Sequence, residues 1–77
     1  MKIEYDSEAN ALYITLREAP VAETDEVTER LIVDYDAAGL PIGIEILGVR
    51  ELLNPEDLAR ITVENLLAEP AGASGTS

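Results

Sequence analysis

The sequence has no cysteine and no histidine among its 77 residues. Without cysteine, neither a disulfide nor a thiolate-ligated zinc site can form. Without histidine, the chain lacks the most frequent transition-metal ligand and the most frequent general base at neutral pH. The residues of the common catalytic sites are therefore missing. We expect a protein that is not an enzyme and that uses no cofactor.

Basic residues are also scarce, with Lys and Arg numbering 5 against 16 Asp and Glu, for a net charge of −11. Such a surface repels phosphate groups, so we expect no nucleic acid and no membrane as partners. It attracts basic proteins instead and keeps the chain in solution. The sequence has no apolar run near the ~20 residues that span a bilayer and no apolar segment after its first residues, which predicts a cytoplasmic protein.

Aromatic residues make up only 4% of the chain, all of them tyrosine, whereas hydrophobic residues make up 47%. The composition predicts a folded domain with an aliphatic core. A domain of this length buries only about 60% of the surface of its unfolded chain, so its stability margin is thin. A partner chain remains as a source of extra stability. We place the single domain at 1–68 and a disordered tail at 69–77.

Alternation of apolar and polar residues predicts strands, and their expected ranges are 2–6, 11–17, 30–35 and 41–47. The acidic segment 21–29 is either an edge strand or a loop. The predicted fold class is α+β. It consists of an antiparallel β-meander of about four to five strands with one short C-terminal helix packed on one face.

The helix prediction depends on Asn54, which is a suitable N-cap, and on Pro55, which suits the first helical position. We expect this helix to run to about Arg60, after a short helical turn at 49–53. Residues 61–66 fit either a closing strand or a helical face, with the strand slightly favoured.

The hairpin between the third and fourth predicted strands has a predicted register. A four-residue turn at 36–39 makes the expected cross-strand partners Tyr35 with Leu40, Val33 with Ile42, Leu31 with Ile44, and Arg30 with Glu45. This register separates the side chains into two faces. The predicted core face carries Ile3, Tyr5, Leu12, Ile14, Leu16, Leu31, Val33, Ile42, Ile44 and Ile46.

The opposite face carries Tyr13, Thr15, Ile32, Asp34, Gly43, Glu45 and Leu47. It is too apolar for a purely solvated face and too charged for a core. Mixed faces of this kind often form interfaces, and we take Tyr13, Thr15, Ile32 and Leu47 as the interaction candidates. The alternative is that the C-terminal segment covers this face.

Acidic residues around the predicted turn have the spacing of a calcium-binding loop. Counted from Asp34, acids fall at loop positions one, three and twelve (Asp34, Asp36 and Glu45), and Gly39 falls at position six. Position five is Ala38, so one oxygen ligand is missing, and the flanking segments alternate as strands rather than helices. A β-turn in which aspartate accepts hydrogen bonds from backbone amides is the favoured interpretation, and we assign no metal site.

Several stretches resemble a widespread bacterial family of small proteins, the domain-of-unknown-function family numbered 2283. They are YDSEANALYI at 5–14, VDYD at 33–36, Gly39, and GIEILG at 43–48. The resemblance extends over about 1–49. It implies a compact α+β domain and brings no established activity to any residue.

The sequence therefore favours a small non-catalytic interaction module. It would form a homodimer or bind a basic protein partner, and an inhibitor-like or antitoxin-like role fits its size and acidity. The alternative is a domain that binds a divalent metal or a small ligand through Asp34, Asp36 and Glu45.

Overall fold

The chain folds into five strands and two short helices. This computed structural model describes residues 1–64. The elements are β1 (Lys2–Asp6), β2 (Ala11–Thr15), β3 (Glu23–Thr28), β4 (Leu31–Tyr35), β5 (Pro41–Leu47), α1 (Val49–Leu52) and α2 (Pro55–Leu58). The predicted domain boundary at residue 68 and the predicted tail at 69–77 lie outside the described range.

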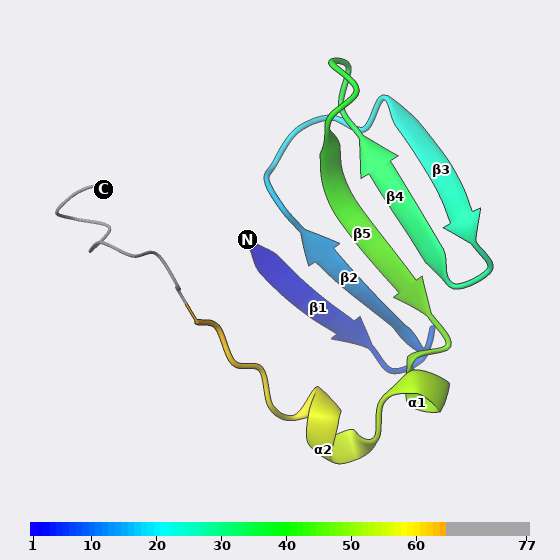
Figure 1. Cartoon of the computed structure of the whole chain (residues 1–77), viewed down its shortest axis with the longest axis vertical. Helices are drawn as coiled ribbons and strands as arrows, with labels where there is room; N and C mark the ends of the chain where they lie inside the picture. The colour runs from blue at the N-terminus through cyan, green and yellow to red at the C-terminus, as the bar shows by residue number, and fades with distance from the viewer. Residues whose placement is uncertain (65–77) are drawn as a thin grey trace, which may run out of the picture.

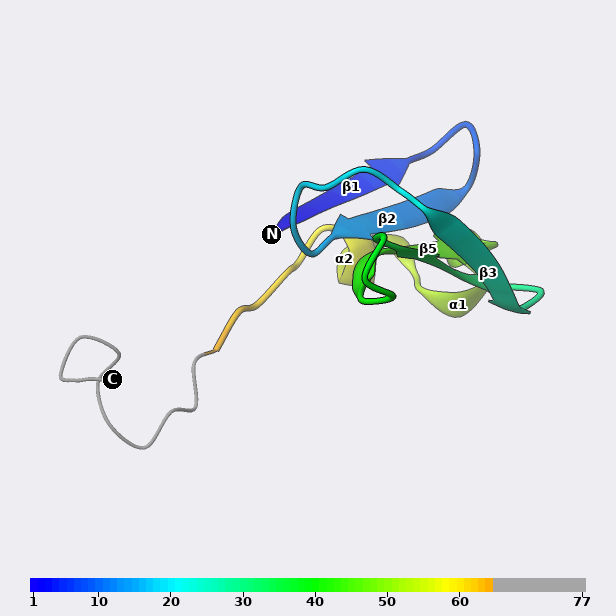
Figure 2. The same ribbon diagram turned by 90° about the horizontal axis from the view of Figure 1, so that it is seen from above.

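All five strands form one antiparallel sheet in the order β1-β2-β5-β4-β3. Figure 1 shows β5 at the centre of the sheet, between β2 and β4. Figure 2 shows that the sheet is a single twisted layer with both helices on one side of it. The α+β class is confirmed, and the segment that the sequence left open between strand and loop is the edge strand β3.

The predicted meander is wrong, because β2 pairs with β5 and not with β3. The acids of β3 are distributed over both of its faces, and all its residues are exposed. The apolar strand β5 stabilises the sheet more when both of its edges are paired, so it takes the central position. The connection between β2 and β3 carries Pro20 and crosses to the far edge of the sheet.

The hairpin of β4 and β5 does not have the predicted register. The observed partners are Leu31 with Ile46, Ile32 with Glu45, Val33 with Ile44, Asp34 with Gly43, and Tyr35 with Pro41. For Leu31 to Asp34, the observed partner lies two residues further along β5 than the predicted partner. Arg30 therefore does not face Glu45. Because side chains alternate along a strand, a slip of two residues keeps every side chain on its predicted face.

The turn explains this slip. The Asp36 carboxylate accepts hydrogen bonds from the backbone N–H of Ala38 and of Leu40, each at 2.9 Å. Gly39 takes the left-handed conformation, with φ of 83°. The ladder shifts register between Asp34 and Tyr35, which adds an unpaired residue on β5. The sequence predicted the aspartate-capped turn but did not reveal this bulge.

Arg30 lies at the other end of the hairpin, where its side chain binds residues at the end of β5 and in α1. Its guanidinium donates to the carbonyl oxygens of Leu47 at 3.3 Å and Gly48 at 3.0 Å, and it pairs with the Glu51 carboxylate at 3.0 Å. Arg30 therefore fixes the junction between β5 and α1 rather than a cross-strand pair inside the sheet.

The predicted start of α2 is confirmed, and its end is earlier than predicted. The Asn54 side chain accepts from the Asp57 N–H at 2.9 Å, and the Asp57 carboxylate accepts from the Asn54 N–H at 3.2 Å. The helix ends at Leu58 instead of about Arg60. The helical turn expected at 49–53 is confirmed as α1. No helix within 1–64 is long and apolar enough to cross a membrane.

The predicted closing strand does not form over residues 61–64, and its last two residues lie outside the described range. Ile61 and Val63 are 61% and 87% exposed. Ile61 lines an open hollow with Ile3 and Leu12, whereas Val63 is almost fully exposed, and residues 61–64 pair with no strand of the sheet. β-branched residues alone do not make a strand without pairing and packing.

The turn between β1 and β2 holds α1 in place. Asn10, with a left-handed φ of 55°, accepts the Val49 N–H with its backbone oxygen at 3.1 Å and the Arg50 N–H with its side-chain oxygen at 2.8 Å. The Arg50 guanidinium donates to the Ser7 carbonyl oxygen at 2.8 Å. These bonds satisfy amides that the helix itself leaves unpaired, and they enclose Val49 completely.

The core is smaller than the sequence predicts. Within the described chain, the buried apolar side chains are Ala11, Ile42 and Val49, of which only Val49 has no exposed surface. Of the ten predicted core residues only Ile42 is among them, while Ile3 and Tyr5 are exposed and the rest are half-buried. The predicted face is correct, but its burial is not, because the two short helices cover only part of the sheet (Figure 2).

This difference predicts an order of mutational effects. Ile42→Ala should lower the free energy of unfolding by about 2–5 kcal/mol, as for a buried isoleucine. Leu31→Ala should cost clearly less, because the Leu31 side chain keeps part of its contact with water. Urea unfolding followed by circular dichroism measures both, and Ile42→Val serves as the mild variant if Ile42→Ala does not fold. A larger loss for Leu31→Ala would contradict this core.

Candidate functional site

One face of the sheet, which we call the mixed face, carries a hydrogen-bonded group of side chains from three strands. The Tyr13 hydroxyl of β2 donates to the Asp34 carboxylate of β4 at 2.6 Å. The second oxygen of Asp34 accepts from the Thr24 hydroxyl of β3 at 2.7 Å. Asp34 is therefore held from both sides, and this group links strands that are not neighbours in the sheet.

Gly43 allows this arrangement, because it lies on β5 between Tyr13 and Asp34. A Cβ at residue 43 would lie 2.2 Å from the Tyr13 hydroxyl oxygen and 2.8 Å from the ring carbon that bears it. The tyrosine ring therefore lies flat over a strand that offers no side chain there. Only glycine leaves this space, which explains why a central strand tolerates a residue of low strand propensity.

The environment of Tyr13 changes its acidity. The hydrogen bond to Asp34, then burial, and then the negative charges of Asp34, Glu45 and Glu4 raise the pKa of the Tyr13 hydroxyl to about 12. Each of these effects disfavours the phenolate. A tyrosine whose proton is held this firmly is a structural donor at neutral pH and a poor acid or base.

Asp36 is engaged in its own turn. Its carboxylate accepts the turn amides described above and pairs with the Arg17 guanidinium. The backbone hydrogen bond from Leu40, then the side-chain bond from Arg17, lower the pKa of Asp36 below its ordinary value. Arg17 was not among the residues selected from the sequence, since its position after β2 gave no signal of contact with the distant turn.

The three carboxylates considered for a metal site do not meet. Asp34 binds Tyr13 and Thr24 on the mixed face, Asp36 caps the turn, and Glu45 lies opposite Ile32 on the neighbouring strand. Across residues 1–64, no three Asp or Glu residues group closely enough to hold a metal ion. The spacing of these acids along the chain reflects a hairpin and its turn.

The four interaction candidates do share the mixed face, as predicted. The register places Tyr13 opposite Glu45, Ile32 between Glu45 and Glu26, and Leu47 opposite Ala11. Thr15 lies opposite Gly43. Apolar side chains on this face are thus separated by acids, and its tyrosine already has a partner.

The opposite face, which we call the apolar face, is more continuous. One row crosses the sheet as Ile3, Ile14, Ile44, Val33 and Asp25, and the next row as Tyr5, Leu12, Ile46, Leu31 and Thr28. Each row has four large apolar side chains in succession before it reaches β3. These side chains are half-buried, except Ile3 and Tyr5 of β1, which are 38% and 39% exposed.

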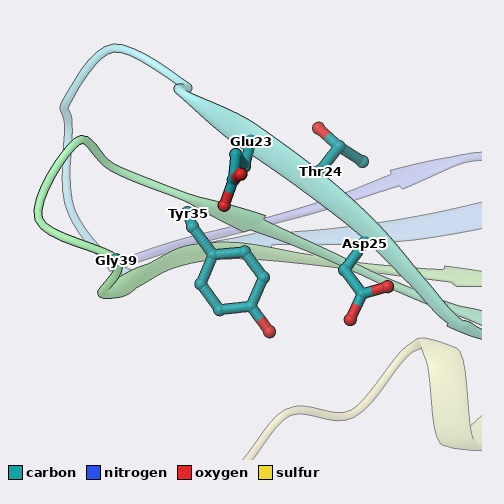
Figure 3. Close-up of a pocket in the computed structure, with 5 residues that line it drawn as sticks. All are labelled: Glu23, Thr24, Asp25, Tyr35 and Gly39. Atoms are coloured by element: carbon teal, nitrogen blue, oxygen red, sulfur yellow. The ribbon is translucent and has the colours of Figure 1, made fainter.

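Among the open hollows of residues 1–64, two lie along the apolar face, and a third, between the sheet and α2, is lined in part by Ile3, Leu12, Leu58 and Ile61. The first, of about 410 Å³, is lined by Glu23, Thr24, Asp25, Tyr35 and Gly39. Figure 3 shows the Tyr35 ring and the Asp25 carboxylate on the same side of the sheet, with Thr24 pointing away from them. The second, of about 440 Å³, is lined by Tyr5, Arg50, Leu53, Pro55, Leu58 and Ala59. Neither hollow was predicted from the sequence, since each depends on how separate elements pack together: β3 against β4 and its turn in the first, and β1 against the helical segment in the second.

Fold and site together define a class of protein: a small α+β domain made of one antiparallel sheet, with shallow hollows and a half-covered apolar face. The family described as Protein of unknown function (DUF2283) matches residues 2–50, and the chain belongs to this family. The match includes all five strands and ends at the start of α1. Searches of curated proteins and of solved structures give no match.

The contact between Tyr13 and Gly43 gives a second prediction. In Gly43→Ala the new methyl group displaces the ring, so the Asp34 bond is lost and unfolding becomes easier by about 1–3 kcal/mol. The pKa of Tyr13 should then fall from about 12 toward its ordinary value near 10. An ultraviolet titration of tyrosinate measures this, with Tyr13→Phe identifying which of the three tyrosines responds.

The same pKa sets a pH dependence of stability. A pKa raised in the folded chain means that the folded state holds the proton more tightly than the unfolded state. The stabilisation from Tyr13 is present below pH 10 and is lost as the pH rises to about 12. The melting temperature of the wild-type chain should fall across this window more than that of Tyr13→Phe. Parallel curves for the two proteins would contradict the prediction.

Proposed function

We propose that the protein is a small non-catalytic interaction module that binds a basic protein partner through the apolar face of its sheet. The supporting observation is the two rows of large aliphatic side chains that stay half-buried across β2, β5 and β4. A soluble monomer rarely leaves a continuous apolar patch of this kind in contact with water, and such patches mark sites of protein association.

Association would also supply stability that the isolated chain has little of. Three buried apolar side chains within residues 1–64 make a very small core for a domain of this size. A partner that covers the apolar face removes the same side chains from water, at about 25 cal/mol for each Å² of apolar surface. Binding and folding stability are therefore coupled in this protein.

Charge supports a basic partner. The chain carries a net charge of −11, which steers a positively charged protein toward it. Where the apolar rows end at β3, the first hollow presents the carboxylates of Glu23 and Asp25 beside the Tyr35 ring. Carboxylates next to an aromatic face suit a lysine or arginine side chain. An inhibitor-like or antitoxin-like role, in which an acidic module covers a basic protein, fits this surface.

Binding through Tyr13, Thr15, Ile32 and Leu47 of the mixed face stays a competing prediction. It has less support, because Tyr13 is bonded to Asp34 and Ile32 lies between two acids. Two adjacent residues of β4 can distinguish these predictions, because they lie on different faces of the sheet. Val33 belongs to the apolar face and Ile32 to the mixed face, and both are half-buried.

Val33→Lys and Ile32→Lys form a matched pair that tests the proposal. Each adds one ammonium group at the middle of β4, and each new lysine lies opposite an acid of β3, Asp25 or Glu26. We expect Val33→Lys to weaken capture of the partner from native lysate at least about tenfold, a loss typical of a residue central to an interface. Ile32→Lys should capture it like the wild type.

The readout is the amount of a stoichiometric band, identified by mass spectrometry, that the tagged full chain retains. Circular dichroism of both variants establishes that they fold. Loss with Ile32→Lys alone would assign the interface to the mixed face and reject the apolar face. Equal capture by both folded variants would reject the sheet as the binding surface.

A further inference from the structure

The two edges of the sheet differ in how they are protected against pairing with another strand. At β3, a bulge interrupts the ladder between Glu26 and Thr28. Glu23 and Asp25 place carboxylates on the apolar side of this edge, and Glu26 places one on the mixed side. Bulges and charges on the inward side are the usual devices that keep an edge strand from pairing.

The edge at β1 has neither a bulge nor an inward charge, and its charged side chains, Lys2, Glu4 and Asp6, lie on the mixed side. Its five residues pair with β2 in unbroken register, with no bulge and no proline. All five are exposed, and within residues 1–64 the sheet ends at β1. On the apolar side this edge presents Ile3 and Tyr5 rather than acids. An edge of this kind offers its backbone groups to a further strand.

The charges of β1 fit a second copy of the same strand. Lys2 is the only lysine of the chain, and it lies two residues from Glu4 on the mixed side of the strand. The two groups are 3.8 Å apart, and both side chains are more than half exposed, at 60% and 58%. A positive and a negative group at this spacing become self-complementary when the strand meets its own antiparallel copy.

We propose that two copies of the chain associate through β1, with the strands antiparallel and Ile3 opposite Ile3 of the second copy. In this register Lys2 faces Glu4 of the second copy, and Glu4 faces Lys2, so the opposite-charge pair occurs twice. Met1, which is 88% exposed, then lies opposite Tyr5 of the second copy. The two sheets become one sheet of ten strands with a continuous apolar face.

The neighbouring registers are less favourable. A shift that keeps the faces aligned but centres the pair on Glu4 forms two Lys2–Asp6 pairs and places two glutamates opposite each other between them, and like charges in that position destabilise a sheet. The register centred on Ile3 has its two opposite-charge pairs without a like-charge pair. A slip of one residue places charged side chains opposite apolar ones and mixes the faces. Centring on Ile3 is the arrangement that satisfies both the charges and the apolar side chains.

This association goes beyond the proposed function, since it uses the edge of the sheet and needs no other protein. Edge pairing leaves the apolar face free for a partner. It buries less surface than a standard interface of about 1,600 Å², so the dimer is weak and forms at high concentration. Self-association of the purified chain tests pairing at the β1 edge, whereas capture of a partner from lysate tests binding at the apolar face.

Exchanging the charges of Lys2 and Glu4 tests this proposal. Sedimentation equilibrium measures dimerisation of the full chain from about 10 μM to 1 mM, a range suited to a weak dimer. Lys2→Glu and Glu4→Lys should each weaken dimerisation at least about tenfold, because the changed pair occurs twice in the dimer. The double variant, Lys2→Glu with Glu4→Lys, should return the dissociation constant to within about threefold of wild type. Both positions are exposed, so the fold of each variant should be unchanged.

Amide hydrogen exchange locates the contact. Amides of Lys2–Asp6 should exchange more slowly as the protein concentration rises, while those of Glu23–Thr28 should not change. A chain that stays monomeric up to about 1 mM would overturn the proposal, as would a double variant that fails to restore the dimer. Protection at every concentration of those β1 amides that do not bond to β2 would also overturn it, since the edge would then be covered within one chain.

Discussion

The ladder between β2 and β5 is the interaction on which the rest of the structure depends. It joins residues far apart in sequence, from Ala11 with Leu47 to Thr15 with Gly43, and it connects the β1–β2 hairpin to the β3–β4–β5 unit. Without it the two units would share no strand pairing. It brings Tyr13 over Gly43 so that the hydroxyl reaches Asp34, and it brings Asn10 to the first amides of α1. Both faces of the sheet are thus created by one pairing that local sequence patterns do not specify.

The sequence predicts most of what is local in this fold. Alternation located the strands, Asn54 and Pro55 located α2, and Asp36 with Gly39 located the turn. It failed where the outcome depended on tertiary contacts. The β4–β5 register depends on a bulge, the strand order depends on the burial of β5, and residues 61–64 do not pair with the sheet. Period-two patterns determine which face a side chain occupies, and a two-residue slip leaves that assignment intact.

The candidate site was predicted less well than the fold. The sequence grouped Asp34, Asp36 and Glu45 by their spacing along a loop, but a hairpin separates them and gives each a different environment. It could not foresee that Gly43 leaves room for the Tyr13 ring, because that contact spans two strands. It also treated the aliphatic face as a closed core. Periodicity shows that side chains share a face, but it does not show whether anything covers that face.

The half-covered sheet also determines how this protein responds to denaturants and to heat. The heat capacity of unfolding and the urea dependence of stability both increase with the apolar surface that unfolding exposes. The aliphatic side chains of the two rows keep part of their surface in water in the folded chain, so unfolding exposes only the remainder. Both quantities are therefore smaller than they would be if a second layer covered these rows. A ligand that covers the apolar face would increase the surface hidden in the folded state, so the same chain would melt more sharply when bound.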